Sequence, residues 1–301
     1  MANSIALAKQ YVPLLDEVYK LASLTADLDG AAELARQGAN ANELIIPKMD
    51  MQGLGDYSRN SGYVEGDVTL TNETVTCNFD RGRMFTVDTM DNMESAGIAF
   101  GRLASEFIRT KVAPELDAFR FATYASVTGI STVTGATLSD GAAVVAALRK
   151  ATTQMDEDEV PLDNRYLYIT PTLYGLVQDM DTTKSREVLS RFAKIVQVPQ
   201  TRFYTQITQK TGKITVSGTG DNATTDDQSA GGYAKATGAK DINFMVIHKP
   251  AVIQFEKHVA PKIITPEANQ TGDAYKFGYR NVGIADVYDN KVSGIYLHKK
   301  A

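Results

Sequence analysis

Residues 66–90 read GDVTLTNETVTCNFDRGRMFTVDTM, and the alternation of their side chains decides the fold class expected for this chain. A period of two is typical of β-strands, whose successive side chains point to opposite faces. Together with ELIIP, which begins at residue 43, the pattern predicts a long β ribbon over residues 43–90. The alternating positions used for this interpretation are Val68, Leu70, Thr74, Thr76, Met84, Thr86 and Asp88.

The ribbon has too few large apolar side chains to bury both of its faces. An isolated two-stranded ribbon is only marginally stable in water, so we expect this one to need a partner surface.

The tip of the predicted ribbon, GLGDYSRNSGYVEG at residues 53–66, mixes glycines and small polar residues with Tyr57, Arg59 and Tyr63. Glycine, Asn and Ser are the residues of an ordinary exposed turn, and that interpretation explains the stretch taken alone. Tyrosine and arginine are also the side chains that protein interfaces concentrate. The tip is therefore either a plain turn or a contact surface, and the neighbouring elements must decide between them.

Composition excludes several classes of protein. The chain has 301 residues, 43% of them hydrophobic, which allows one large core or two smaller ones. A formal net charge of -5 argues against a dedicated nucleic-acid-binding protein. Cys77 is the single cysteine, so no intrachain disulfide can form and a reducing compartment is consistent. The sequence contains neither a signal-peptide pattern nor an apolar run of about 20 residues, so we expect a cytosolic protein without a membrane partner.

Two helical patterns flank the ribbon. Apolar residues at helical spacing over 4–24 predict a helix broken at Pro13, which could pack on its own core or act as an arm that docks on a neighbouring subunit. Residues 91–127 predict a long helix that Pro114 must kink or restart, because proline lacks an N–H and crowds the preceding turn. Glu115 and Asp117, just after this proline, suit a helix start.

A second α/β unit follows residue 133. Ser139 or Asp140 can cap a helix that runs to about Gln154. We expect RYLYITP to be a short buried strand, SREVLSRFAKIVQVP an amphipathic segment and DINFMVIHKPAVIQF an apolar strand. Residues 217–241 have almost nothing to bury and predict a mobile surface loop. The end of the chain alternates again and should pair as antiparallel strands with an earlier element.

Catalytic and ligand-binding patterns are weak throughout. No glycine-rich loop is followed by Lys and Ser or Thr, as a phosphate site would need. The acidic stretch with Asp221, Asp226 and Asp227 could hold a hard cation, but a solvated loop explains it better. We expect neither metal nor cofactor and no enzymatic activity. The remaining candidates, for which we favour structural or surface roles, are His248, His258, His298, Cys77 and the acidic turn Asp156–Glu159.

The order of the predicted elements resembles the major capsid proteins of tailed bacteriophages, an α+β fold. The strings that carry the resemblance are IIPKMDMQGLGDYSRNSGYVEGDVTL, DRGRMFTVDTMDNMES, FIRTKVAPELDAFRFATYA, IVQVPQTRFY and FMVIHKPAVIQFEKH. The resemblance implies an N-terminal arm over 1–42, an extended β-hairpin loop over 43–90, a peripheral domain with a long spine helix from 91–132 and 255–301, and an axial domain over 133–254.

Such a protein would assemble with itself in pentamers and hexamers into the icosahedral head of a virion, built in the host cytoplasm. The resemblance further implies a separate scaffolding protein, a portal, a decoration protein and weak non-specific contact with packaged double-stranded DNA. Residues 53–66 contain no lysine for a covalent cross-link, so we expect non-covalent cohesion. The candidate intersubunit contacts are Tyr57, Arg59, Tyr63, Arg81 and Arg83.

Two alternatives remain open at this stage. An encapsulin-like nanocompartment would use the same fold to enclose cargo enzymes rather than a genome. A soluble hydrolase would use carboxylates such as Asp226 or Glu157 and would form no large particle.

Overall fold

The computed structural model describes residues 23–30, 36–37, 43–90, 98–135, 137–180, 182–217 and 224–300. The helix and arm predicted for residues 4–24 lie outside the described residues except at positions 23 and 24. The architecture is α+β, as expected. Within the described ranges, no helix is both long and apolar enough to cross a membrane.

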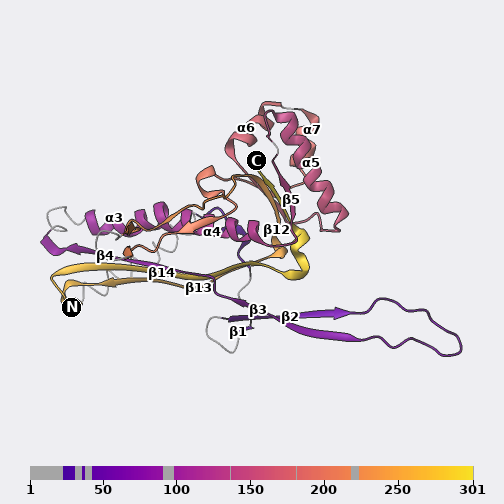
Figure 1. The fold of residues 1–301 in the computed structure, drawn as a ribbon, viewed down its shortest axis with the longest axis horizontal. Helices are drawn as coiled ribbons and strands as arrows, with labels where there is room; N and C mark the ends of the chain where they lie inside the picture. The colour runs from indigo at the N-terminus through magenta and orange to yellow at the C-terminus, as the bar shows by residue number, and fades with distance from the viewer. Residues whose placement is uncertain are drawn as a thin grey trace.

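A two-stranded ribbon extends from the body of the molecule (Figure 1). Strands β2 (Glu43–Met51) and β3 (Val68–Thr76) pair antiparallel, and the two-residue β1 (Arg36–Gln37) adds to β2 near the base. Most side chains of β3 are exposed, in agreement with the predicted lack of a buried face.

The ribbon is shorter than the sequence predicted, because β4 (Phe79–Asp88) belongs to a different sheet. β4 pairs antiparallel with β14 (Ala274–Val287), which also pairs with β13 (Val252–Ile264). Phe79 and Phe85 explain the difference, since their rings pack on Phe119 and Phe107 of the helices above this sheet. Their burial favours pairing with β14 over extension of the ribbon.

The long helix lies along this sheet (Figure 1) and consists of α3 (Ile98–Phe107), a π-helical turn η3 (Ile108–Val112) and α4 (Ala113–Ser126). The helix therefore does not restart at Pro114, because helical backbone continues from α3 through η3 into α4. The N–H of Ala113 donates to the carbonyl of Ile108, five residues back, so the widened turn takes up the proline that an α-helical turn would exclude.

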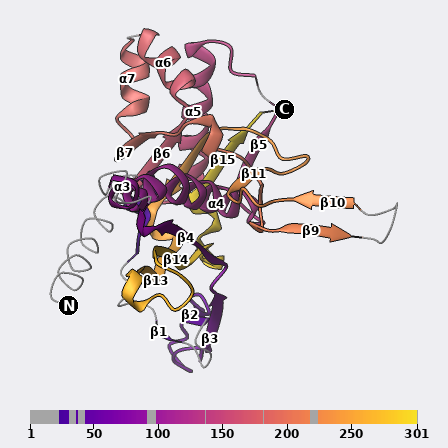
Figure 2. The same cartoon turned by 90° about the vertical axis from the view of Figure 1, so that its left-hand side faces the viewer.

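The second sheet has the strand order β5–β15–β12–β6–β7, and helices α5 to α7 lie beside it (Figure 2). Apolar side chains of α5 and α6 pack on one face, and Phe121 and Tyr124 of α4 contribute to the core on the other. The bounds are β5 Ser131–Thr134, α5 Gly141–Glu157, β6 Arg165–Ile169, α6 Pro171–Met180, α7 Thr183–Leu189, β7 Lys194–Gln197, β12 Ile242–His248 and β15 Ile295–Lys299.

The cap predicted for α5 is confirmed, because the Asp140 carboxylate accepts a hydrogen bond from the N–H of Ala143. The strand predicted from RYLYITP is also confirmed as β6. β15 was expected in the peripheral region with 255–301, but it lies between β5 and β12 of the second sheet. Four of its five residues are buried there.

The amphipathic segment SREVLSRFAKIVQVP contains the end of α7, which stops at Leu189, and the strand β7, which pairs parallel with β6. Two sequence predictions are wrong in this region. DINFMVIHKPAVIQF is divided by a 3-10 turn, η6 (Lys249–Ala251), between β12 and β13, which lie in different sheets.

The stretch 217–241 is not a featureless loop. A hairpin of β9 (Ile214–Ser217) and β10 (Thr224–Asp227) projects from the body (Figure 2), and β11 (Tyr233–Lys235) pairs with β8 (Ile207–Gln209). The remaining 3-10 turns are η1 (Ala26–Leu28), η4 (Gln200–Arg202), η7 (Pro266–Ala268) and η8 (Asp289–Gly294).

Candidate assembly surfaces

One face of the ribbon is apolar and open to solvent. The register sets Met49 opposite Leu70 and Met51 opposite Val68. Residues two apart in a strand point to the same face, so all four side chains share one side of the ribbon. Their exposed fractions are 56% and 63% for the methionines and 65% each for Val68 and Leu70. These four side chains form the apolar face of the ribbon. Contiguous exposed apolar side chains are uncommon on soluble proteins, and where they occur they mark interaction sites.

The opposite face of the same segment is polar. Lys48 lies opposite Thr71, and Asp50 opposite Thr69. The ribbon is therefore amphipathic across its thickness, which allows one face to bind a surface while the other stays in water.

The tip of the ribbon is folded into a compact turn. The backbones of Ser58 and Gly62 form an isolated antiparallel bridge, and the Ser58 hydroxyl accepts hydrogen bonds from the N–H groups of Asn60 and Ser61. Gly62 has a φ of 82°, a conformation that favours glycine. The rings of Tyr57 and Tyr63 meet edge to face with centroids 4.9 Å apart.

Both tyrosine rings nevertheless stay in water, with exposed fractions of 61% for Tyr57 and 87% for Tyr63, and Arg59 between them is exposed too. A preformed aromatic pair loses little conformational entropy on binding, which is the property of an interface anchor.

Arg81 and Arg83 lie elsewhere, on β4, which belongs to the body of the molecule and not to the projecting ribbon (Figure 1). They line a groove of about 800 Å³ between β4, the π-helical turn and the segments around β8 and β11. Arg81 is held within the chain, because its Nε lies 2.8 Å from Glu115 Oε1 and its Nη2 donates to the carbonyl of Lys210 at 2.7 Å. Arg83 is exposed and donates to the carbonyl of Ser229 at 2.9 Å.

The five candidate contact residues therefore form two separate groups. Tyr57, Arg59 and Tyr63 are together at the ribbon tip, and the two arginines lie on the groove. Within one subunit the structure does not bring these groups together.

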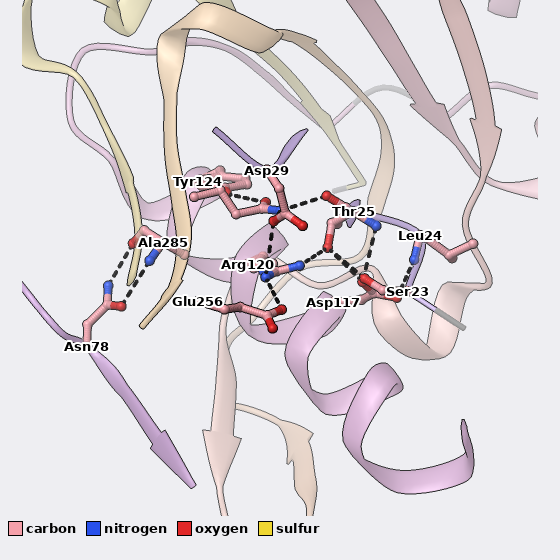
Figure 3. A network of polar contacts seen from close by, with 11 residues as sticks. Ser23, Leu24, Thr25, Asp29, Asn78, Asp117, Arg120, Tyr124, Glu256 and Ala285 are labelled. Carbon is pink, nitrogen blue, oxygen red and sulfur yellow. Dashed lines mark hydrogen bonds and ion pairs between the residues drawn. The ribbon is translucent and has the colours of Figure 1, made fainter. Parts of the chain in front are cut away.

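A buried carboxylate on α4 was missed by the sequence analysis. Asp117 is fully buried and accepts hydrogen bonds from the Ser23 hydroxyl at 2.9 Å, the Leu24 N–H at 3.0 Å and the Thr25 hydroxyl at 2.8 Å (Figure 3). The Thr25 N–H donates to the same carboxylate at 3.3 Å, and Arg202 Nη1 donates to its Oδ2 at 3.1 Å. These five bonds satisfy a carboxylate that would otherwise be costly to bury.

A buried cation lies one turn further along the same helix. Arg120 is 2% exposed, donates to the Thr25 hydroxyl at 2.8 Å and to Glu256 Oε1 at 3.0 Å, and lies 3.6 Å from Asp29 (Figure 3). In the sequence, Asp117 suggested only a helix start, although its spacing from Arg120 places both side chains on one helix face.

Of the two carboxylates named for a hydrolase, Asp226 and Glu157, the first accepts a hydrogen bond from Gln228 Nε2 at 2.7 Å, and the adjacent carboxylates Asp156 and Asp227 are engaged in structural contacts. Asp156 accepts hydrogen bonds from buried Arg165 at 2.7 Å and from Arg191 at 2.8 Å. Partial burial raises the pKa of Asp156, but the hydrogen bonds and charges of Arg165 and Arg191 outweigh this effect. The pKa of Asp156 therefore lies below its usual range. Asp227 accepts a hydrogen bond from the N–H of Ser229. Among the described residues, no cluster of three or more His, Cys, Asp or Glu side chains could hold a metal ion.

The three histidines have no common site. His298 is stacked on Phe244 with 4.8 Å between ring centroids and hydrogen bonds to the side chain of Asn243 at 3.1 Å. His248 is buried at the end of β12, whereas His258 lies exposed on β13.

Comparison with known proteins finds no matching family model and no matching curated sequence. The fold, however, matches many solved structures. A chain of Gordonia phage Cozz superposes with a TM-score of 0.58 at 11% identity, covering 93% of this chain and 86% of that one. The capsid of cyanophage P-SCSP1u gives 0.55 at 15% identity, with 88% and 85% covered. The virus-like particle of Pyrococcus furiosus gives 0.55 at 10% identity, with 96% and 99% covered. The chain therefore shares its fold, over nearly its whole length, with subunits of viral and virus-like shells.

Proposed function

We propose that this chain is a major capsid protein that assembles with itself into the icosahedral head shell of a tailed bacteriophage and encloses its double-stranded DNA. The observation that carries the proposal is the projecting ribbon, whose apolar face is left exposed by the described parts of the subunit, on a fold shared with phage capsid chains. A shell subunit has no need of a catalytic site, in keeping with the structural engagement of its carboxylates. Its site of action would be the virion, after assembly in the host cytoplasm.

The ribbon would bind a neighbouring copy of the chain through its apolar face and its tip. The groove lined by Arg83 is a suitable receiving surface, because Phe85 and Phe107 give it an apolar floor while Lys111 adds positive charge. The ribbon tip carries opposite charge at the exposed carboxylates of Asp56 and Glu65, and exposed Asp67 follows directly after it. Complementary charge of this kind favours correct encounter and register.

The ribbon tip projects away from β4 and the long helix, whose residues line the groove, so a subunit cannot fill its own groove (Figure 1). A contact between two different surfaces of identical subunits is heterologous and generates closed rings when the rotation between neighbours closes. Pentamers and hexamers are such rings. A separate scaffolding protein, a portal, a decoration protein and weak contacts with DNA phosphates complete the proposed set of partners.

The test begins with electron microscopy and sedimentation of the purified protein, followed by analysis of the particle contents. We expect closed shells, and particles isolated from infected cells should hold nuclease-protected DNA. Particles that hold a protein cargo and no nucleic acid would instead favour an encapsulin-like compartment. A protein that stays monomeric under all assembly conditions would contradict a shell function and reopen the hydrolase alternative.

The docking geometry has its own test, a mixing experiment. One variant lacks the tip, residues 53–66, and keeps the groove; the other carries Arg83→Glu with Lys111→Glu and keeps the ribbon. Neither variant should form shells alone. When they are mixed, one intact ribbon can meet one intact groove, so a complex of one copy of each should form and grow no further. If the mixture contains only monomers, the groove is not the receiving surface.

A further inference from the structure

The segment Ser23–Gly30 is an eight-residue strap that crosses the body between residues 1–22 and the ribbon. It contains the single 3-10 turn η1, and most of its side chains are exposed or half-buried. Thr25 and Leu28 are the two exceptions, with exposed fractions of 0% and 1%. Leu28 joins the apolar core beside Phe121 of α4, and half-buried Leu24 packs against the same core, so two apolar side chains and one hydroxyl anchor the strap.

The polar anchor of the strap satisfies two opposite charges at once. The Thr25 hydroxyl donates to Asp117 and accepts from Arg120, which are both on α4 (Figure 3). Asp117 receives further bonds from the strap at the Ser23 hydroxyl and the backbone N–H groups of Leu24 and Thr25. With the strap removed, Arg202 would be the remaining partner recorded for this carboxylate in the described part of the chain.

The far end of the strap is fixed to β13. Gln254 is 1% exposed and donates through Nε2 to the Thr25 carbonyl at 2.7 Å and to Asp29 Oδ1 at 2.6 Å. Its own oxygen accepts from the Tyr124 hydroxyl at 2.8 Å, and the Gly30 N–H donates to its backbone carbonyl at 3.0 Å. The strap thus joins α4, β13 and, through Asp117, the η4 turn that carries Arg202.

This bonding pattern differs from that of the core. A core strand that detaches exposes apolar surface, which strongly resists release. The strap is held mainly by hydrogen bonds to charged groups, and those groups can be solvated by water when it leaves. Local opening of such a segment costs less than global unfolding. The strap can therefore be docked or released while both sheets remain folded.

We propose that the strap is a latch: when docked, it is fixed against α4 and β13, and this docked state is required for assembly but not for folding. The inference rests on the proposed shell function, because the docked strap would form part of the surface that neighbouring copies contact. Asp117, Arg120 and Gln254 are its positioning residues.

The test compares the same substitution at a buried and an exposed aspartate. Asp117→Asn replaces one accepting oxygen by an amide N–H₂, which then faces the hydrogen-bond donors of the strap. Thr25→Val removes the hydroxyl that Asp117 and Arg120 share. Asp27→Asn is the matched control, since Asp27 forms only a surface ion pair with Lys194. Hydrogen exchange is followed at Leu24 and Thr25 as strap reporters and at residues of β12 as core reporters, and particle yield is measured by sedimentation.

For Asp117→Asn and Thr25→Val we expect strap exchange to rise about tenfold or more, because bonds to a charged group are lost. Exchange in β12 should stay as in the unmodified protein, while particle yield falls severalfold. Asp27→Asn should change neither reading.

Three results would overturn the latch. Strap exchange could remain slow in both variants, β12 could open together with the strap, or shells could form at normal yield with the strap released. The last result would leave the shell function intact. If the unmodified protein forms no particles at all, the proposed function fails first, and the exchange data then describe only a local opening.

Discussion

Substitution of Leu70 by lysine on the apolar face of the ribbon should block assembly without unfolding the subunit. Leu70 is 65% exposed and lies opposite Met49. Complete burial of a leucine side chain contributes about 1.5–3 kcal/mol, so covering the exposed part of Leu70 at an interface should contribute roughly 1–2 kcal/mol.

Lysine at this position removes that contribution and adds the cost of desolvating an ammonium group, reduced where the side chain can reach water. We expect a total loss of about 2 kcal/mol or more for each ribbon contact, which corresponds to roughly 30-fold in the association constant. Since every subunit of a ring donates one ribbon, the concentration needed for assembly should rise by at least about this factor.

The matched control is Thr69→Lys, which places the same side chain one residue away on the polar face, opposite Asp50. Assembly is measured as particle yield against protein concentration by sedimentation, and folding by thermal unfolding of the unassembled subunits. Both variants should unfold at nearly the same temperature as the unmodified protein, because both positions are exposed. Equal assembly by the two lysine variants would show that the apolar face is not buried in the shell.

Two further predictions concern the second sheet. Burial, with lesser effects from nearby cations, lowers the pKa of His248 and of His298, so the unfolded chain binds more protons than the folded one below about pH 6.5. Stability should therefore be constant above that pH and fall as the pH drops through it, and a flat unfolding temperature between about pH 7.5 and 5.5 would contradict this. Gly141→Ala should destabilise the subunit by about 1–3 kcal/mol, since its Cβ would lie 2.3 Å from the Leu176 carbonyl oxygen. Gly175→Ala meets no atom within 4 Å and should stabilise helix α6 by up to about 1 kcal/mol in urea unfolding, so equal effects of the two alanines would refute the packing argument.

Local patterns were enough to predict several elements. The alternation around Leu70 gave an exposed ribbon, the Asp140 side chain gave the start of α5, and the apolar run RYLYI gave the buried strand β6. Each of these signals depends on residues a few positions apart, through the period of a strand or the reach of a capping side chain.

Other elements could not be predicted because their partners are distant in the sequence. β4 reads like a continuation of the ribbon, yet it pairs with β14 about two hundred residues later. Arg81 reads like a free interface side chain, yet its guanidinium is bound to Glu115 and to backbone carbonyls near β8 and β11. Such contacts form only where the folded chain happens to place a complementary group.

The sequence by itself determined that this protein has an exposed amphipathic ribbon, a long helix through Pro114 and an apolar α/β unit, because these follow from side-chain periodicity and backbone sterics. Only the tertiary structure decided that Met49, Met51, Val68 and Leu70 share one open face, since a shift of one residue in register would have sent half of them to the other side. It also decided that Asp117 is a buried anchor for the strap and not an exposed helix-start residue. Periodicity fixes the faces of an element, whereas the long-range packing of the whole chain fixes what each face meets.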